Sequence, residues 1–137
     1  MKMKNNIKDV PFLLMRCIMA YGFFNAGIMK YLDIKGNSDW FKSIGLPFPI
    51  FNTWLSGGIE MFGAVMLCLG FMTRIVSISL IFIMCIAIFT VHLYNGFFAS
   101  NDGFEINLYY IIMLLTLLVQ GAGIYSLDYR IKTKKST

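Results

Sequence analysis

The sequence predicts an all-α fold, an integral membrane bundle of four transmembrane helices. Apolar residues make up 58% of the 137 residues and charged residues only 14%, with a mean hydropathy of +0.68. A soluble domain of this size needs more charge. Four apolar stretches approach the ~20 residues that cross a bilayer as a helix. These stretches leave no room for a soluble domain, so residues 1–137 are expected to form one membrane domain, with spans over residues 10–31, 51–71, 74–97 and 105–124.

The first stretch is expected to be a retained transmembrane helix rather than a signal peptide. Pro11 suits the first turn of a helix. Arg16 interrupts the apolar run, which is also too long for a signal peptide, and no clean cleavage site follows. Five residues at helical spacing share one face, which we expect to turn into the bundle. They are Arg16, Ala20, Phe23, Gly27 and Lys30.

The connection over residues 32–50 precedes the second span. Its Gly-Asn-Ser sequence at 36–38 is typical of a turn, and residues 39–42 predict a short interfacial helix with Trp40 at headgroup depth. Pro47 and Pro49 exclude a continuous helix into the second span. In that span several small residues share a face with Glu60, which would hide the carboxylate from lipid.

The third and fourth spans are joined by short turns. Thr73 is expected to cap the third span, which carries His92 near its outer end and closes at Gly96. The fourth span begins near Glu105 and ends at the Gly-Ala-Gly sequence of residues 121–123. The glycine-rich faces would also suit a homodimer.

Basic residues predict the orientation. Lys2, Lys4 and Lys8 precede the first span, Arg74 lies between the second and third, and four more basic residues lie in the tail over 125–137. The positive-inside rule therefore places both termini, with this basic tail, in the cytoplasm. The net charge of +5 is explained by this topology rather than by nucleic-acid binding. The expected partner is the lipid bilayer, whose anionic headgroups the tail would contact.

Ionisable side chains inside the apolar stretches indicate where function lies, because a charge in hydrocarbon is costly unless it pairs or lines a polar cavity. At a rise of 1.5 Å per residue, Arg16 lies about 9 Å and Glu60 about 16 Å from the cytoplasmic side. We therefore predict an ion pair between them. The remaining groups form an expected outer cluster: Lys30, His92 and Glu105, with Asn25 and Asn107 nearby.

Two interpretations of these groups stay open. In the functional one, Glu60, His92 and Glu105 are the candidate catalytic residues that handle protons. The candidate ligand-binding residues are then Arg16, Lys30, Asn25 and Asn107. In the structural one, ion pairs fix helix packing and the outer residues extend to the headgroups. No metal site is expected, because the three cysteines lack CxxC or Cys/His spacing, and one histidine cannot ligate several haems.

Short motifs along nearly the whole chain carry a family resemblance. After Arg16 they are GIMK at 27–30, GLP at 45–47, GIEMFG at 58–63, GFMTR at 70–74, GFE at 103–105 and GAGIYSLD at 121–128. In this order and spacing the chain resembles the DoxX/DoxD family of small four-helix bacterial inner-membrane proteins. The family often has Glu-Tyr-Pro after the third span, where this chain has Glu-Ile-Asn at 105–107.

The resemblance implies a multi-pass protein of the bacterial inner membrane, and it leaves two functions open. Some members look like membrane subunits of redox systems, including thiosulfate:quinone oxidoreductase. This chain would then handle a quinone or a small sulfur compound and would need a soluble redox partner, because the sequence contains no electron carrier. More distant relatives look like cargo receptors or assembly chaperones. The alternative is a non-catalytic scaffold, chaperone or transporter-like binding protein, so whether the chain is an enzyme stays open.

Overall fold

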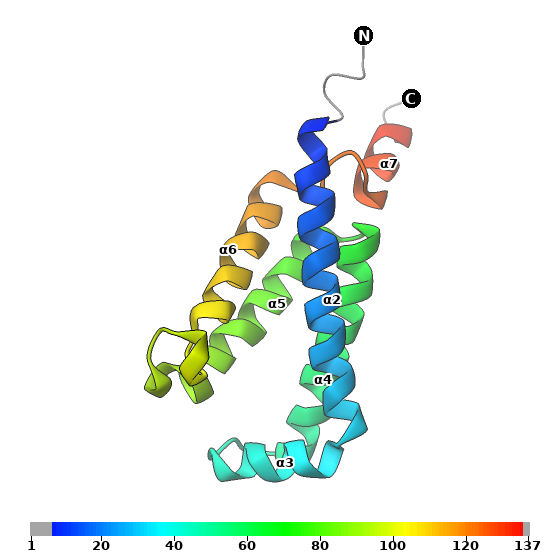
Figure 1. The fold of residues 1–137 in the computed structure, drawn as a ribbon. Helices are drawn as coiled ribbons and strands as arrows, with labels where there is room; N and C mark the ends of the chain where they lie inside the picture. The colour runs from blue at the N-terminus through cyan, green and yellow to red at the C-terminus, as the bar shows by residue number, and fades with distance from the viewer. Residues whose placement is uncertain (1–6, 136–137) are drawn as a thin grey trace.

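A computed structural model describes residues 7–135, and every regular element in this range is a helix (Figure 1). The all-α prediction is confirmed. Lys2 and Lys4 lie outside the described residues. The elements in chain order are η1 (Ile7–Asp9), α2 (Val10–Leu32), α3 (Ile34–Ser43), α4 (Pro49–Leu69), α5 (Thr73–Ala87), the π-helical η2 (Ile88–His92), η3 (Leu93–Asn95), η4 (Ala99–Asn101), α6 (Glu105–Gln120) and α7 (Leu127–Lys134).

The long helices form two pairs. α2 packs along α4, and α5 packs along α6 (Figure 1). The pairs lie close together at the end of the molecule that carries α7, and they diverge toward the opposite end. There α3 lies across the bundle and packs mainly on α4. We call these two ends the α7 end and the α3 end.

Small residues let α2 and α4 approach closely. A Cβ on Gly27 would lie only 2.8 Å from the carbonyl oxygen of Gly57, so the two backbones touch there. The predicted inner face of the first span is confirmed, since Arg16, Ala20 and Phe23 are buried together with Gly27. The bundle core beside it consists of fully buried apolar side chains, among them Met19, Leu67, Leu80, Leu114 and Leu117.

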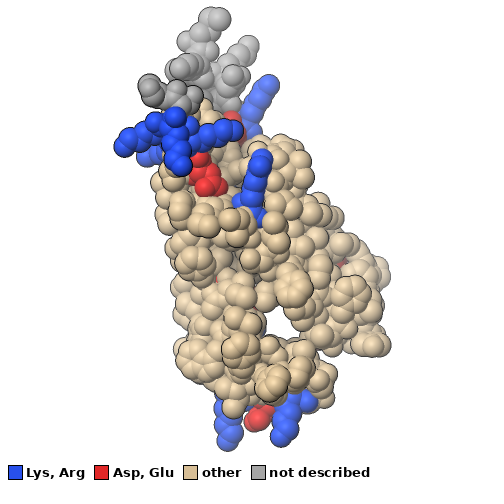
Figure 2. Space-filling view, turned by 180° about the vertical axis from the view of Figure 1, so that it is seen from behind, with Lys and Arg blue, Asp and Glu red and all other residues tan. Residues whose placement is uncertain are grey.

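The outer surface is an apolar belt between two charged ends. Figure 2 shows Lys and Arg side chains at the α7 end and at the α3 end, with almost none between them. Large apolar side chains point outward from this belt, including Ile18, Tyr21, Phe62 and Phe82, each more than 60% exposed. Such a surface is suited to contact with lipid and not with water.

Within residues 7–135, two helical stretches are long and apolar enough to cross a membrane, Ile7–Leu32 and Thr73–Asn95, and Glu105–Gln120 is a shorter apolar helix. Helix α4, with 21 residues, is also long enough to cross a membrane. Its mean hydropathy is lowered by Asn52, Ser56 and Glu60, which line an internal cavity. Two of the four expected spans, the first and the third, are thus long and apolar enough by themselves to cross a membrane.

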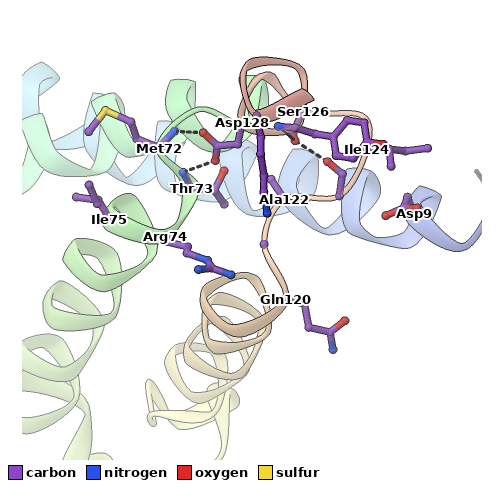
Figure 3. Close-up of a pocket in the computed structure, with 14 residues that line it drawn as sticks. Asp9, Met72, Thr73, Arg74, Ile75, Gln120, Ala122, Ile124, Ser126 and Asp128 are labelled. Carbon is purple, nitrogen blue, oxygen red and sulfur yellow. Dashed lines mark hydrogen bonds between the residues drawn. The ribbon is translucent and has the colours of Figure 1, made fainter. Parts of the chain in front are cut away.

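Three local expectations are wrong. The turn at 36–38 lies inside α3, because the Asp33 carboxylate accepts the Gly36 N–H and starts a helix there. The fourth span ends where the Gly-Ala-Gly sequence begins, as expected, but its last helical residue is Gln120 and not 124, because Gly121 turns the backbone at φ +89°. Thr73 does not cap α5. The Asp128 carboxylate does so instead, accepting the N–H groups of Met72 and Thr73 at 2.8 and 2.9 Å (Figure 3).

Candidate functional site

A cavity of about 460 Å³ opens between the diverging helix pairs at the α3 end. The space-filling view shows an opening through this part of the molecule (Figure 2). Most of its wall is apolar, from α4, α5 and the aromatic residues of α3. Seven polar residues interrupt this wall: Lys30, Asn52, Ser56, Glu60, Thr90, His92 and Asn107. An apolar cavity with a few polar groups is the usual form of a small-molecule site.

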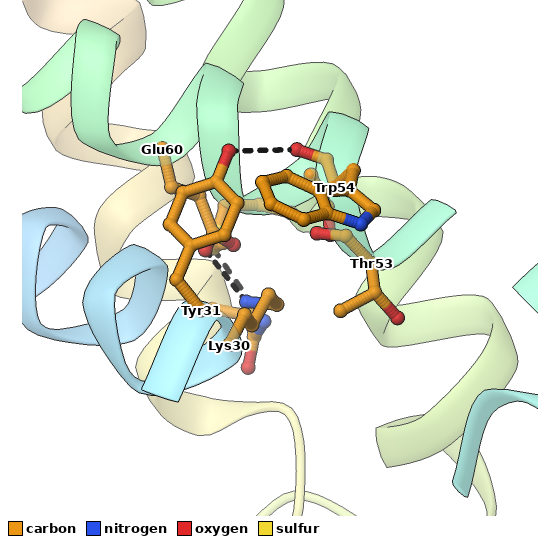
Figure 4. A network of polar contacts seen from close by, with 8 residues as sticks. Lys30, Tyr31, Thr53, Trp54 and Glu60 are labelled. Carbon is orange, nitrogen blue, oxygen red and sulfur yellow. Dashed lines mark hydrogen bonds and ion pairs between the residues drawn. The ribbon is translucent and has the colours of Figure 1, made fainter. Parts of the chain in front are cut away.

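The Lys30 ammonium and the Glu60 carboxylate form an ion pair in this wall, with Nζ 2.6 Å from Oε2 (Figure 4). Their side chains are 18% and 4% exposed. Helical side chains lean toward the N-terminus of their own helix. Because α2 and α4 are antiparallel, Lys30 and Glu60 lean toward each other.

Aromatic residues close α2 onto α4 beside this pair. The Tyr31 hydroxyl donates to the Trp54 carbonyl at 2.9 Å, and the two rings lie 5.0 Å apart (Figure 4). Gly57 keeps the helices close, since a Cβ there would lie 3.4 Å from the Lys30 Cβ. The ion pair therefore lies between two helices that are in close contact.

His92 ends the π-helical turn η2 on the other side of the cavity. Single π-turns within α-helices are frequent at functional sites. Its Nδ1 lies 2.6 Å from the Asp102 carbonyl oxygen. A carbonyl only accepts, so this contact requires a hydrogen on Nδ1. In the neutral ring, Nε2 is then a free acceptor.

Asn107 comes from the first turn of α6 and is 9% exposed. Its Nδ2 donates to the Met84 sulfur at 3.5 Å, a weak partner. Among the described residues, its Oδ1 has no hydrogen-bond partner. Asn107 therefore brings an acceptor to the wall formed by α5 and α6.

The predicted Arg16–Glu60 ion pair is wrong. Arg16 is fully buried and donates from Nη2 to the Tyr125 carbonyl at 2.6 Å and from Nη1 to the Leu67 carbonyl at 3.4 Å. It leans toward the N-terminus of α2, away from Glu60. Arg16 thus holds the segment before α7 against the bundle and does not reach the cavity.

The expected outer cluster divides in the structure. Lys30 leaves it to pair with Glu60. The Glu105 carboxylate, expected in the same cluster as His92, instead accepts the Ala99 N–H at 2.9 Å and the Tyr109 hydroxyl at 2.7 Å. Asn25 is exposed on α2 and donates to the Tyr21 carbonyl. Asn107 and His92 line the cavity, and Glu105 and Asn25 do not.

Sequence reasoning missed several cavity residues. Trp40 and Phe41 of α3 form part of the wall, and no sequence signal shows that this helix lies across the bundle. Asn52 and Ser56 also line the cavity. Asn52 precedes Glu60 by two turns of the same helix and Ser56 precedes it by one turn. Helical spacing therefore predicts that all three share a face, and this signal was available in the sequence.

A second cavity, of about 630 Å³, lies at the α7 end (Figure 3). Arg74 and Lys132 lie in its wall with Asp9 and Asp128, so its charges are balanced. The Asp128 carboxylate is occupied by the N-terminus of α5. The cavity at the α3 end is therefore the stronger candidate for a ligand site.

Comparisons with known proteins agree with the helical membrane architecture. The model of the DoxX family matches residues 12–93, which include Lys30, Glu60 and His92. A Haemophilus influenzae "Uncharacterized protein" is 31% identical over 96% of this chain and 89% of its own length. The Bacillus subtilis "Putative oxidoreductase CatD" is 32% identical over 96% of each chain. A Mycobacterium tuberculosis "Uncharacterized membrane protein" is 28% identical over 91% of this chain and 83% of its own length. No solved structure matches the chain.

Proposed function

Because this chain belongs to the DoxX family of membrane proteins, we propose that it crosses the bacterial inner membrane four times. The spans are α2, α4, α5 continued by η2 and η3, and α6. The apolar belt between the charged ends supports this arrangement. We place the α7 end in the cytoplasm, since Lys and Arg side chains gather there (Figure 2). Arg74 and Lys132 of α7 are among them, because both line the cavity at this end. Both termini are then cytoplasmic.

Reporter fusions test this topology. We expect green fluorescent protein fused after Thr137 to fluoresce, because it folds in the cytoplasm. Alkaline phosphatase fused after Gly103 should be active, because the loop before α6 lies outside. An active phosphatase fused after Thr137 would contradict the cytoplasmic C-terminus, and an inactive one after Gly103 would contradict the number of spans.

The cavity at the α3 end supports a redox role for this protein. We propose that it binds the ring of a quinone, or a small sulfur compound, and acts as the membrane subunit of a redox system. The supporting observation is an apolar cavity of about 460 Å³ whose polar wall combines the Lys30–Glu60 pair with His92. This volume suits a substituted ring. Because the cavity opens between the helix pairs, the apolar tail of a membrane quinone has room to extend from it. The name of the Bacillus relative is consistent with redox chemistry.

In this proposal Glu60 and His92 exchange protons with the bound ring, since carboxylate and imidazole groups perform this chemistry near neutral pH. Electrons pass to or from a soluble partner protein. Glu105 lies outside the cavity wall and is not among the ligand contacts.

Tryptophan fluorescence tests ligand binding. Trp40 lines the cavity and Trp54 does not. In lipid nanodiscs, the single-tryptophan variant Trp54→Phe should show saturable quenching by duroquinone. Trp40→Phe, which leaves only Trp54, should show quenching that rises linearly with duroquinone concentration, as expected for duroquinone that is dissolved in the lipid and not bound. Linear quenching in both variants would contradict the proposed function.

Glu60→Gln, made in the Trp54→Phe background, should weaken duroquinone binding about tenfold, because Lys30 loses the ion pair that positions its ammonium as a donor to the ring carbonyl. Asp39→Asn is the matched control, as this exposed carboxylate of α3 is outside the cavity wall. It should leave binding unchanged.

One observation supports the second candidate, a non-catalytic scaffold or binding protein. Lys30 and Glu60 join α2 to α4 directly beside the glycine contact of these helices. The same ion pair therefore serves packing, whether or not it serves chemistry.

A further inference from the structure

The polar wall of the cavity contains more free acceptors than free donors. Glu60 uses Oε2 for Lys30, and Oε1 has no hydrogen-bond partner among the described residues. His92 uses Nδ1 for the Asp102 carbonyl, which leaves Nε2 as an acceptor. Asn107 uses Nδ2 for Met84, which leaves Oδ1. Three further residues of the wall each keep an acceptor oxygen: Asn52, Ser56 and Thr90. The free donors are the two remaining ammonium hydrogens of Lys30 and one amide hydrogen each on Asn52 and Asn107.

A hydroxyl group matches this wall better than a carbonyl group does. A hydroxyl donates one hydrogen bond and also accepts, so it can serve the acceptors and Lys30 alike. A quinone carbonyl can only accept, from Lys30 or from the amide groups of Asn52 and Asn107. It would leave the acceptors of Glu60, His92 and Asn107 unpaired in a site that the ligand has closed to water, which is costly. A site built for a hydroxyl discriminates strongly against an analogue without one.

We infer that the cavity selects a dihydroxylated ring, the reduced quinol form, over the quinone. This inference rests on the proposed function and specifies which form of the ligand the site holds. The acceptors come from both helix pairs, with Glu60 on α4 and His92 and Asn107 from η2 and α6. A ring with hydroxyl groups at opposite positions can therefore donate to both walls of the cleft.

Three related ring compounds test the inference in the Trp54→Phe variant. These are duroquinol kept under anaerobic conditions, duroquinone, and the dimethyl ether of duroquinol, which has no hydroxyl hydrogen. We expect duroquinol to bind about tenfold tighter than duroquinone, and the ether to bind no better than the quinone. Equal affinities for all three would overturn the inference and leave the proposed function standing. Linear quenching by all three would overturn both.

A second variant identifies the acceptor. In His92→Asn, the amide nitrogen can keep the donation to the Asp102 carbonyl, while the acceptor that corresponds to Nε2 is lost. Duroquinol affinity should fall about tenfold, with duroquinone affinity unchanged. His92→Gln should retain more of the preference, because its longer amide can bring an acceptor to the cavity. An undiminished preference for quinol in His92→Asn would refute the role of His92.

Discussion

Replacing Gly27 with alanine should destabilise the bundle by about 2 kcal/mol. The new Cβ would lie 2.8 Å from the Gly57 carbonyl oxygen and 2.5 Å from the Met61 Cγ. The Gly57 carbonyl belongs to the backbone and cannot turn aside as a side chain can, so α2 and α4 must move apart. Overpacking of this kind costs about 1–3 kcal/mol, and the better helix propensity of alanine offsets at most about 1 kcal/mol of it.

The measurement is unfolding of the purified protein by a denaturing detergent, followed by tryptophan fluorescence. Gly58→Ala is the matched control in α4, because its Cβ would meet only the Tyr31 hydroxyl, at 3.0 Å. The tip of this side chain can shift, so stability should change by less than about 0.5 kcal/mol. If Gly27→Ala proves as stable as Gly58→Ala, α2 and α4 do not pack through their backbones.

Gly27 also links packing to the site. It lies one turn before Lys30 on the inner face of α2, and Gly57 lies one turn before Glu60 on α4. Separating the helices at the glycines therefore moves the ammonium and carboxylate groups apart. Gly27→Ala should weaken duroquinol binding as well as stability, whereas Gly58→Ala should change neither.

The helices themselves were predictable, because long apolar runs with one face of small and polar residues allow few other structures. The first span was expected at residues 10–31, and α2 covers Val10–Leu32. Its inner face was also identified correctly, since helical spacing alone determines which residues share a face.

The partner of Glu60 was not predicted. Counting 1.5 Å per residue places Cα atoms at a height in the membrane, but it ignores the lean of each side chain toward the N-terminus of its helix. This lean carries Arg16 away from Glu60, to the Tyr125 carbonyl. It carries Lys30 from the rim of its helix inward, to Glu60. Had this lean been included, the antiparallel packing of α2 and α4 would have paired Glu60 with Lys30 and not with Arg16.

The surroundings of His92 could not have been derived from periodicity. The loop between η3 and α6 folds back on itself, and the Asp102 carbonyl reaches the imidazole. The Glu105 carboxylate turns to the Ala99 N–H instead. Both contacts depend on the path of an irregular loop, in which Asp102 adopts a left-handed backbone at φ +57°. Sequence spacing contains little information about such a path.

Removing the ammonium group of the central ion pair should destabilise the protein strongly. In Lys30→Met the Glu60 carboxylate, 4% exposed in the present structure, is left without a partner. Breaking a buried pair in this way costs about 3–5 kcal/mol. Glu60→Met should cost less, because Lys30 is 18% exposed and its long side chain can turn toward the opening of the cavity. Denaturing-detergent titration of both variants measures these losses.

The double variant Lys30→Met/Glu60→Met separates packing from function. Apolar side chains of similar volume often replace a buried ion pair without loss of stability, so the double variant should be more stable than Lys30→Met. If the pair serves only to join α2 to α4, ligand binding should recover along with stability. If it forms the polar wall of a ligand site, stability should return while saturable quenching of Trp40 by duroquinol does not. We expect the second outcome, because Glu60 faces the cavity with one carboxylate oxygen that no described residue occupies.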